Sequence, residues 1–297
     1  MADFELGDEV ARGKTKVLYR VPGSPELVYL VALRTLTKND NPDETIVFDE
    51  KDVFATRTTC AVFELLERHG ILTAYEGRVS DNVFMAQLCD LTKLEVIVRR
   101  YAVGSFLKRY PDLRVDGPVP HRFDKVVFEL FLKTNDGRVT DRNGAVHEVT
   151  MTDPKTGRRI DDPWIANPYD IEWEIVHPKM PVGADGRSCM DHWIPTGAIL
   201  QEGIFVGMIE EVVTKVFLIL ESAFAATGGY RLIDFKLELG VTADGRLVVA
   251  DVIDNDAWRL RTSEWKEVSK ERFRQGAEVE EIAALYGFVA DLVEQFE

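Results

Sequence analysis

The chain has 297 residues, 45% of them hydrophobic, which is enough for one large domain or two smaller ones with a real core. Its formal net charge of −15 at pH 7 argues against a nucleic-acid or membrane partner that needs a basic surface. An acidic protein that handles anionic metabolites must concentrate its basic residues locally. We therefore expect small-molecule ligands, bound at local clusters of Lys and Arg.

Cysteine and histidine usage favours a reducing cytoplasm. The three cysteines, Cys60, Cys89 and Cys189, form no CxxC arrangement, and the five histidines show no zinc-ligand spacing. The N-terminal sequence is acidic rather than basic and then apolar, and no membrane-length apolar run occurs. A cytoplasmic protein is expected.

The first basic motif, RGKTK at 12–16, leads into an apolar run at 17–19, and a second β-like run at 27–33 follows a Pro-Gly turn. This pattern predicts a hairpin in which Lys14 and Lys16 share one strand face. Such a pair of ammonium groups can hold nucleotide phosphates. The spacing of a Walker loop is absent, and solvated strand lysines are the alternative interpretation.

The next stretch, 37–52, is polar, acidic and turn-rich, and predicts a surface loop. Helical periodicity covers 55–69 and ends at a glycine. Strands are predicted at 83–88 and 94–98. The short link between these strands, 90–92, is a candidate hinge between two lobes.

The densest basic cluster, 99–109, joins a predicted strand to a short helix, with Gly104 and Ser105 at the turn. Backbone amides at such a turn can approach an anion, which favours a phosphate or carboxylate site. A basic face that is paired with surrounding acids is an equally good interpretation.

Further elements are a strand at 128–133, a long loop with small hairpins at 134–196, and two core helices at 203–226 and 270–297.

The stretch 231–261 carries the most specific pattern. Apolar and polar residues alternate from Leu232 to Leu239, so Asp234, Lys236 and Glu238 share one strand face. An apolar run at 247–253 follows, with the turn dipeptide Asp244-Gly245 between the two.

Pairing outward from a two-residue turn at Asp244-Gly245 places Glu238 opposite Asp251. Two negative charges directly opposite each other on one sheet face require a cation between them. Magnesium is usually held by one or two carboxylates together with substrate phosphates. A metal-nucleotide site is the functional interpretation, and a solvated hairpin with accidental charges is the alternative.

Four of these stretches resemble the SAICAR synthetase family, in the family's order: RGKTKVLY, VRRYAVGSFLKR, ELFLK with a later Asp162-Pro163, and LIDFKLELG through DVIDNDAWRLR. The resemblance spans nearly the whole chain and implies an α+β fold of two lobes with ATP between them. A small β-rich lobe, 1–91, would bind nucleotide phosphates, and a larger α+β lobe, 92–297, would carry the metal and substrate site.

In this family ATP activates the carboxylate of a phosphoribosyl aminoimidazole, as an acyl phosphate, and the amine of L-aspartate attacks it. The resemblance implies a cytoplasmic ATP- and magnesium-dependent ligase of purine biosynthesis, compatible with a homo-oligomer. Such chemistry needs positioning and charge neutralisation more than a nucleophilic side chain.

The resemblance also implies residue roles. ATP would be bound by Gly13, Lys14, Lys16, Leu91, Glu238 and Asp251, and magnesium by Glu238 and Asp251. The substrate would be bound by Arg99, Ser105 and Arg259, and the catalytic site would contain Lys236, Asp234 and Arg99. Lys133 and Asp162 are further candidates.

The sequence departs from the family at 39–56, where a glycine-rich loop is replaced by a shorter stretch without those glycines. Because glycines permit a close backbone approach to a substrate, this change leaves two alternatives open. One is a relative that couples an amino acid to a different azole or nucleoside carboxylate, and the other is a nucleotide-binding protein without turnover.

Overall fold

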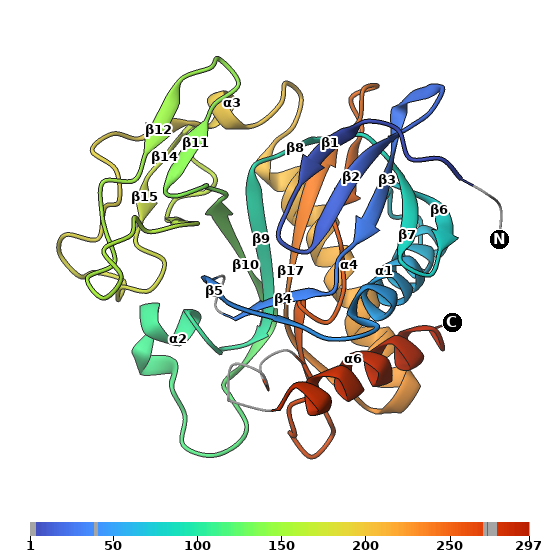
Figure 1. Ribbon diagram of the computed structural model, residues 1–297. Helices are drawn as coiled ribbons and strands as arrows, with labels where there is room; N and C mark the ends of the chain where they lie inside the picture. Colours follow the sequence, from blue (N-terminus) through green and yellow to red (C-terminus); the bar gives the residue numbers. More distant parts are fainter. Residues whose placement is uncertain (1–3, 39–40, 270–271, 273–277, 297) are drawn as a thin grey trace. The chain divides into compact units, whose positions relative to one another are not determined.

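The computed structural model describes residues 4–38, 41–269, 272 and 278–296 (Figure 1). The chain forms two compact units, and each is described by itself. Unit 1 comprises Met1–Asp90, Leu218–Leu232 and Gly240–Glu297, and unit 2 comprises Leu91–Phe217 and Ile233–Leu239. The first change of unit thus falls in the predicted link 90–92, and the chain then returns to unit 1 twice. The functional roles expected of the lobes 1–91 and 92–297 stay predictions.

Unit 1 contains a five-stranded antiparallel sheet in the order β1-β2-β3-β7-β6. Its strands are β1 (Glu9–Arg12), β2 (Lys16–Val21), β3 (Ser24–Ala32), β6 (Tyr75–Ser80) and β7 (Val83–Gln87). The predicted hairpin of β2 and β3 is confirmed, with Leu18 opposite Leu30. Because β2 begins at Lys16, Lys14 lies in the bend before the strand. The prediction that the two lysines share a strand face is therefore wrong.

The predicted surface loop at 37–52 is also wrong, since most of it is a hairpin and a helix start. β4 (Thr35–Lys38) pairs with β5 (Asn41–Val47), with Leu36 opposite Ile46. Helix α1 (Lys51–Arg68) begins four residues before the predicted start at 55. It buries Val62, Phe63 and Leu66, and its contacts with β3, β6 and β7 form part of the core of the unit.

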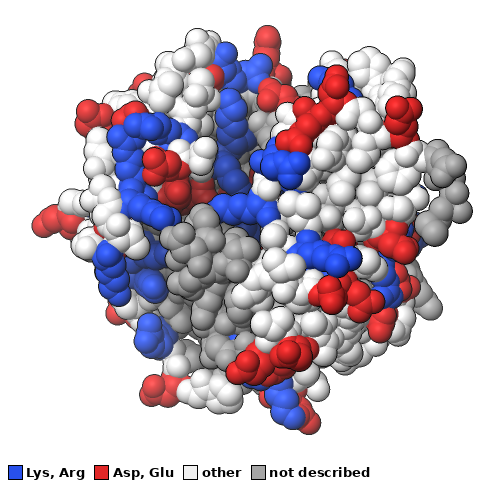
Figure 2. Space-filling model, viewed as in Figure 1, with Lys and Arg blue, Asp and Glu red and all other residues white. Residues whose placement is uncertain are grey.

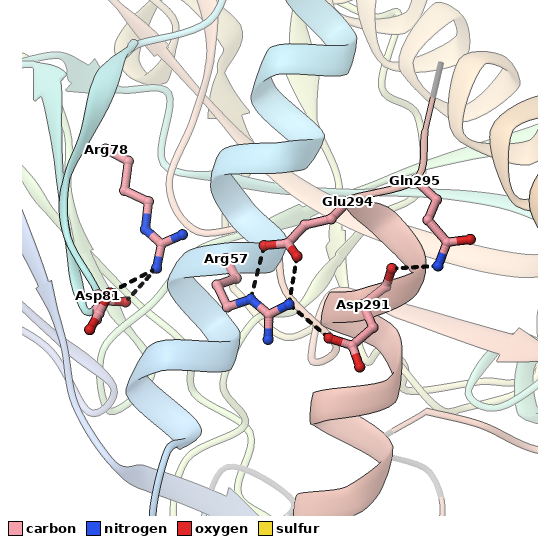
Figure 3. A network of polar contacts seen from close by, with 6 residues as sticks. All are labelled: Arg57, Arg78, Asp81, Asp291, Glu294 and Gln295. Carbon is pink, nitrogen blue, oxygen red and sulfur yellow. Dashed lines mark hydrogen bonds and ion pairs between the residues drawn. The ribbon is translucent and has the colours of Figure 1, made fainter.

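The C-terminal helix α6 (Val279–Val293) packs against α1. Part of the predicted helix 270–297 lies outside the described residues. Arg57 of α1 links the two helices: it donates 2.9 Å and 2.5 Å hydrogen bonds to the Glu294 carboxylate and a 2.7 Å bond to Asp291 (Figure 3). A paired, bidentate arginine holds two helices in one geometry better than a lysine would.

Helix α4 (Val206–Gly228) confirms the predicted core helix at 203–226. Its apolar stripe, including Val213, Phe217 and Phe224, is fully buried. The helix ends before Gly229, whose φ of +69° is the left-handed conformation typical of a helix C-terminus.

Unit 2 is built on a sheet in which β15, β13, β10, β9 and β17 are successive neighbours. The long strands β9 (Leu94–Tyr101) and β10 (Arg122–Leu132) run antiparallel side by side (Figure 1). The strands β13 (Trp164–Ile165) and β15 (Ile175–Val176) have two residues each, and β17 is Arg231–Val241. The predicted strands at 94–98 and 128–133 are thereby confirmed.

The segment 134–196 forms small hairpins and short elements, as predicted. It contains β11 (Arg138–Thr140), β12 (Val146–Glu148), β14 (Glu172–Trp173) and β16 (Ile194–Pro195), and α3 (Thr196–Ile199) follows. Between β9 and β10 lie α2 (Phe106–Arg109) and a 3-10 turn at Pro111–Leu113. The predicted strand, turn and short helix at 99–109 are confirmed.

The hairpin after β17 is confirmed, but its turn is longer than predicted. Thr242 N donates to Arg246 O at 3.0 Å, so three residues, 243–245, form the loop rather than two. Gly245 takes the left-handed conformation that such loops favour. Strand β18 (Leu247–Ala250) ends before Asp251. The predicted register, with Asp251 as the strand partner of Glu238, is therefore wrong.

Charged side chains of both signs are interspersed on the face shown in Figure 2. Neighbouring charges also form local ion pairs in the chain, as Arg12 does with Glu9 and Lys215 with Glu211. No described helix combines the length and apolar character needed to cross a membrane.

Candidate functional site

One face of the unit 2 sheet carries four of the predicted site residues, namely Arg99, Asp234, Lys236 and Glu238. Asp234 of β17 stands opposite Arg99 of β9, and Lys236 stands opposite Ile97. Directly opposed residues share a sheet face, and every second residue of a strand does so too. The charged face of β17 predicted from its alternation is therefore continuous with Arg99 and Glu95 of β9.

At one end of this face, two lysines and two glutamates form a mixed-charge cluster. Lys133, which follows β10, donates from Nζ to Glu238 at 2.5 Å, and its Nζ lies 3.9 Å from Glu95. Lys236 Nζ lies 3.1 Å from the same oxygen of Glu95. Burial lowers the pKa of Lys133, but attraction by Glu238 and Glu95 outweighs this and raises it above its ordinary value. Lys133 is thus an ammonium ion at neutral pH.

At the other end of the face lies a buried network of arginines and acids. Arg99 donates from Nε to Glu129 at 2.5 Å and from Nη1 to Asp234, while Arg109 binds the second oxygen of Glu129. All four side chains are almost fully buried. For Arg99 and Arg109 the structure thus has the alternative arrangement, in which the basic cluster is paired with acids. A buried charge without its partner strongly destabilises a fold, so each of these residues holds its partner in place.

Asp162 lies near the charges of Lys133 and Glu95, in a left-handed conformation with a φ of 45°. Its Oδ1 accepts the backbone N–H of Thr134 at 2.8 Å, and its own N–H donates to the Thr134 hydroxyl at 2.9 Å. Burial raises the pKa of Asp162 to about 6. The hydrogen bond from Thr134 lowers this pKa and repulsion by Glu95 raises it further, and both effects are smaller than that of burial. A carboxyl group with this pKa is partly protonated near neutral pH.

In unit 1 the predicted phosphate-binding lysine and the predicted metal ligand meet. Lys16 Nζ forms an ion pair with Asp251, and both side chains are about one-fifth exposed. Asp251 has a left-handed φ of 67° just after β18, and its carboxylate also accepts the N–H of Val252 at 2.6 Å. Non-glycine residues in this conformation are uncommon and cluster at functional sites.

The segment after Asp251 is anchored by a buried lysine. Lys51, at the start of α1, lies 3.0 Å from Asp254 and 4.0 Å from Asp256. Burial alone would lower the pKa of Lys51, yet the two aspartates raise it. The Tyr286 hydroxyl of α6 donates to Asp256. The segment that carries Asp251 and leads to β19 (Trp258–Arg261) is thereby tied to two helices.

The remaining predicted residues are located as follows. Gly13 and Lys14 lie in the exposed bend before β2, where Gly13 N donates to Lys16 O at 2.9 Å. Leu91 ends β8 (Asp90–Leu91) and is partly exposed. Ser105 precedes α2, and Arg259 is a half-buried residue of β19 in unit 1. Their ligand-binding roles stay predictions.

Glu238 and Asp251 are partly exposed carboxylates, the oxygen donors that magnesium prefers, and in the structure each is paired with a lysine that a bound ion would have to displace. Among the described residues no group of three or more His, Cys, Asp and Glu side chains is arranged to hold a metal ion.

Sequence reasoning missed several members of these clusters. Glu95 shares the strand alternation of Ile97 and Arg99, and Glu129 interrupts the apolar run of β10. A carboxylate in an apolar strand requires a partner, so the same signal that singled out Asp251 was present for Glu129. Lys51 and Asp254 are 203 residues apart, and no local pattern pairs them.

A model of the SAICAR synthetase family matches residues 9–161 and 182–284 of the chain. The chain belongs to this family. The phosphoribosylaminoimidazole-succinocarboxamide synthase of Herpetosiphon aurantiacus is 30% identical over 300 residues, covering 99% of this chain and 100% of that protein. The corresponding synthase of Chloroflexus aurantiacus is 31% identical over 296 residues, covering 97% of each.

Solved structures of SAICAR synthetases share the fold. The enzyme of Ehrlichia chaffeensis has a TM-score of 0.68 at 18% identity and covers 98% of this chain and 100% of that one. A SAICAR synthetase in complex with ADP also has a TM-score of 0.68, at 24% identity over 96% of this chain and 97% of that one. The α+β SAICAR synthetase fold predicted from the sequence is confirmed.

Proposed function

We propose that this SAICAR synthetase family member is an ATP- and magnesium-dependent ligase of de novo purine synthesis. It joins an aminoimidazole ribotide carboxylate to the amine of L-aspartate. The observation that carries this proposal is the family match over nearly the full chain, at 30% identity to a named synthase. The proposal is also supported by Lys16 and Asp251, two residues that the resemblance assigns to ATP and magnesium and that form an ion pair.

The arrangement supports phosphoryl transfer followed by amide formation. The γ-phosphoryl group of ATP carries several negative charges, which the ammonium group of Lys16 is suited to neutralise. Magnesium bound at Glu238 or Asp251 would supply further charge neutralisation. Transfer of the phosphoryl group to the substrate carboxylate creates a leaving group, and the amine then forms the amide as phosphate departs. No protein nucleophile is required.

The buried pairs of Arg99 with Glu129 and Asp234 support a positioning role for this end of the sheet. Arg99 is too deeply buried in the structure to contact a substrate without rearrangement, since its exposure is 1%. We infer that it orients Asp234, and that Arg259 contacts the substrate. The cysteines are free thiols, which is in keeping with a cytoplasmic location.

The test is ADP release from the purified protein with MgATP and the aminoimidazole carboxylate ribotide, with each common amino acid added in turn. We expect turnover with L-aspartate and a product of the mass of the succinocarboxamide. Turnover only with a different amino acid would show that this amino acid, and not aspartate, is the amine donor. No turnover with any donor, while MgATP still binds, would contradict the proposed reaction and favour another carboxylate substrate.

A further inference from the structure

A pair of histidines in unit 2, outside the residues assigned to the reaction, has the geometry of a cation site. His147 lies on β12 and His192 lies just before β16. Nδ1 of His147 and Nε2 of His192 are 2.9 Å apart, and the ring planes are inclined by 33°. Two ring nitrogens therefore face each other directly.

Each imidazole also has a carboxylate at its other nitrogen. His147 Nε2 lies 3.1 Å from Asp141 Oδ2, and His192 Nδ1 lies 2.8 Å from Asp191 Oδ1. A carboxylate oxygen accepts hydrogen bonds, so at these two distances both outer ring nitrogens carry hydrogen and donate.

The hydrogens on the outer nitrogens determine whether the inner nitrogens, Nδ1 of His147 and Nε2 of His192, carry hydrogen or a lone pair. A neutral imidazole with hydrogen on its outer nitrogen has a lone pair on its inner one. Two lone pairs 2.9 Å apart repel each other, so a positive centre must lie between His147 and His192. A proton meets this need by making one ring an imidazolium that donates to the other. A divalent transition-metal ion meets it equally well.

The surroundings favour the metal. A carboxylate on the far nitrogen is the usual second-shell partner of a metal-bound histidine, because it fixes the tautomer and the ring orientation. Two histidines on a tetrahedral zinc ion have their ligating nitrogens about 3.4 Å apart, given Zn–N bonds of about 2.0–2.1 Å. A shift of about half an ångström from the present geometry would therefore admit the ion.

One side of the pair is rigid and the other can adjust. Asp141 Oδ1 accepts the backbone N–H groups of Asn143 at 2.8 Å and Ala145 at 2.9 Å, which leaves Oδ2 for His147. The His147 and Asp141 side chains are 11% and 5% exposed, whereas that of His192 is 46% exposed. The nearby charges of Glu148, Arg138 and Arg159 pair with one another.

We propose that His147 and His192 bind one divalent transition-metal ion, such as Zn²⁺, with Asp141 and Asp191 in its second shell and water completing the coordination. Since no described group of three metal-binding side chains exists, the protein supplies two direct ligands. The site would be distinct from any magnesium bound at Glu238 or Asp251.

The test is a Zn²⁺ titration of metal-free, nucleotide-free protein by isothermal calorimetry. We expect one equivalent to bind, with affinity at least tenfold lower in both His147→Gln and His192→Ala. Asp141→Asn should weaken binding by about 10–100-fold, as second-shell changes do. His121→Ala, which removes an exposed histidine of the same unit, is the matched control and should leave binding unchanged.

Electron paramagnetic resonance with Cu²⁺ gives a readout independent of affinity, because coupling to two imidazole nitrogens is expected in the wild type and to fewer in each His variant. Circular dichroism and thermal unfolding establish that each variant is folded. The proposal is overturned if wild-type protein binds no Zn²⁺ at sub-millimolar concentration. It is also overturned if a folded His147→Gln/His192→Ala double variant binds Zn²⁺ as the wild type does.

Discussion

The Lys133 ammonium nitrogen lies 2.5 Å from Oε1 of Glu238 and 3.9 Å from Oε2 of Glu95, so one cation neutralises two carboxylates from different strands. Glu95 is on β9, Glu238 is on β17, and Lys133 extends from β10. The cation that the structure pairs with Glu238 is thus a lysine 105 residues away in the sequence. The magnesium predicted at Glu238 and Asp251 stays a prediction.

Replacement of Glu238 by Gln tests the metal and nucleotide assignment. The change removes the charge and keeps the shape, so the fold should persist while turnover with MgATP falls by about a hundredfold or more. The measurement is kcat from ADP release. Glu211→Gln is the matched control, because Glu211 makes a comparable 2.7 Å contact with Lys215 but is 67% exposed on α4. Near-wild-type kcat in folded Glu238→Gln would refute the assignment.

Replacement of Arg259 by Ala tests the substrate assignment. If Arg259 binds the anionic azole, the KM for that substrate should rise more than tenfold, since a charge-assisted contact of about 1.5–3 kcal/mol is lost. The KM for ATP should change little. Arg261→Ala is the control on the same strand, where the guanidinium lies 3.4 Å from Glu267. Equal increases in both KM values would mean that Arg259 does not discriminate between the substrates.

Replacement of Lys51 by Met tests the anchor of the segment after Asp251. The variant leaves Asp254 and Asp256 without their buried cation, and breaking such a pair typically costs about 3–5 kcal/mol of unfolding free energy. Urea unfolding measures this loss. Because the Lys51 pKa is raised, the stabilisation is fully present below the lysine's ordinary pKa and is lost only as the pH rises through the higher folded value.

The control for Lys51 is the double variant Lys51→Met/Asp254→Asn. Removing the charge of Asp254 as well should restore part of the lost stability, because the unpaired buried carboxylate is the main cost. If the single variant is as stable as the wild type at pH 7, the anchor contributes nothing measurable.

The raised pKa of Asp162 predicts that this carboxyl lowers folding stability as the pH rises, the reverse of a carboxyl whose pKa is lowered by folding. Since the folded-state value of about 6 exceeds the ordinary value of 3.8, ionisation of Asp162 destabilises the fold. This loss of stability is absent at a pH below the ordinary pKa and complete at a pH above the folded-state pKa. Asp162→Asn should therefore gain stability relative to wild type as the pH rises from 4 to 7, by at most about 3 kcal/mol.

Thermal or urea unfolding of both proteins across this pH range measures the difference. Asn tolerates the left-handed φ of Asp162 and can still accept the Thr134 N–H bond, which makes it a conservative change. A difference between wild type and Asp162→Asn that is independent of pH would contradict the raised pKa.

The sequence by itself determined the elements whose signals are local. The alternation of β17, the apolar stripe of α4 and the glycine after it each follow from side-chain periodicity and backbone preference within about 25 residues. The motifs at 12–16, 98–109 and 231–261 also sufficed to identify the family, because their combination and order are specific even though each alone is common.

Only the tertiary structure decided which charges meet. The one-residue difference in the turn at 243–245 removed Asp251 from the predicted strand pairing, since the register of a hairpin depends on its loop length. Arg99 joins Glu129 and Asp234, and Lys51 joins Asp254, across 30 to 203 residues. Such pairings depend on which strands and helices become neighbours. Local periodicity defines the face on which a side chain lies, but not the partner that faces it.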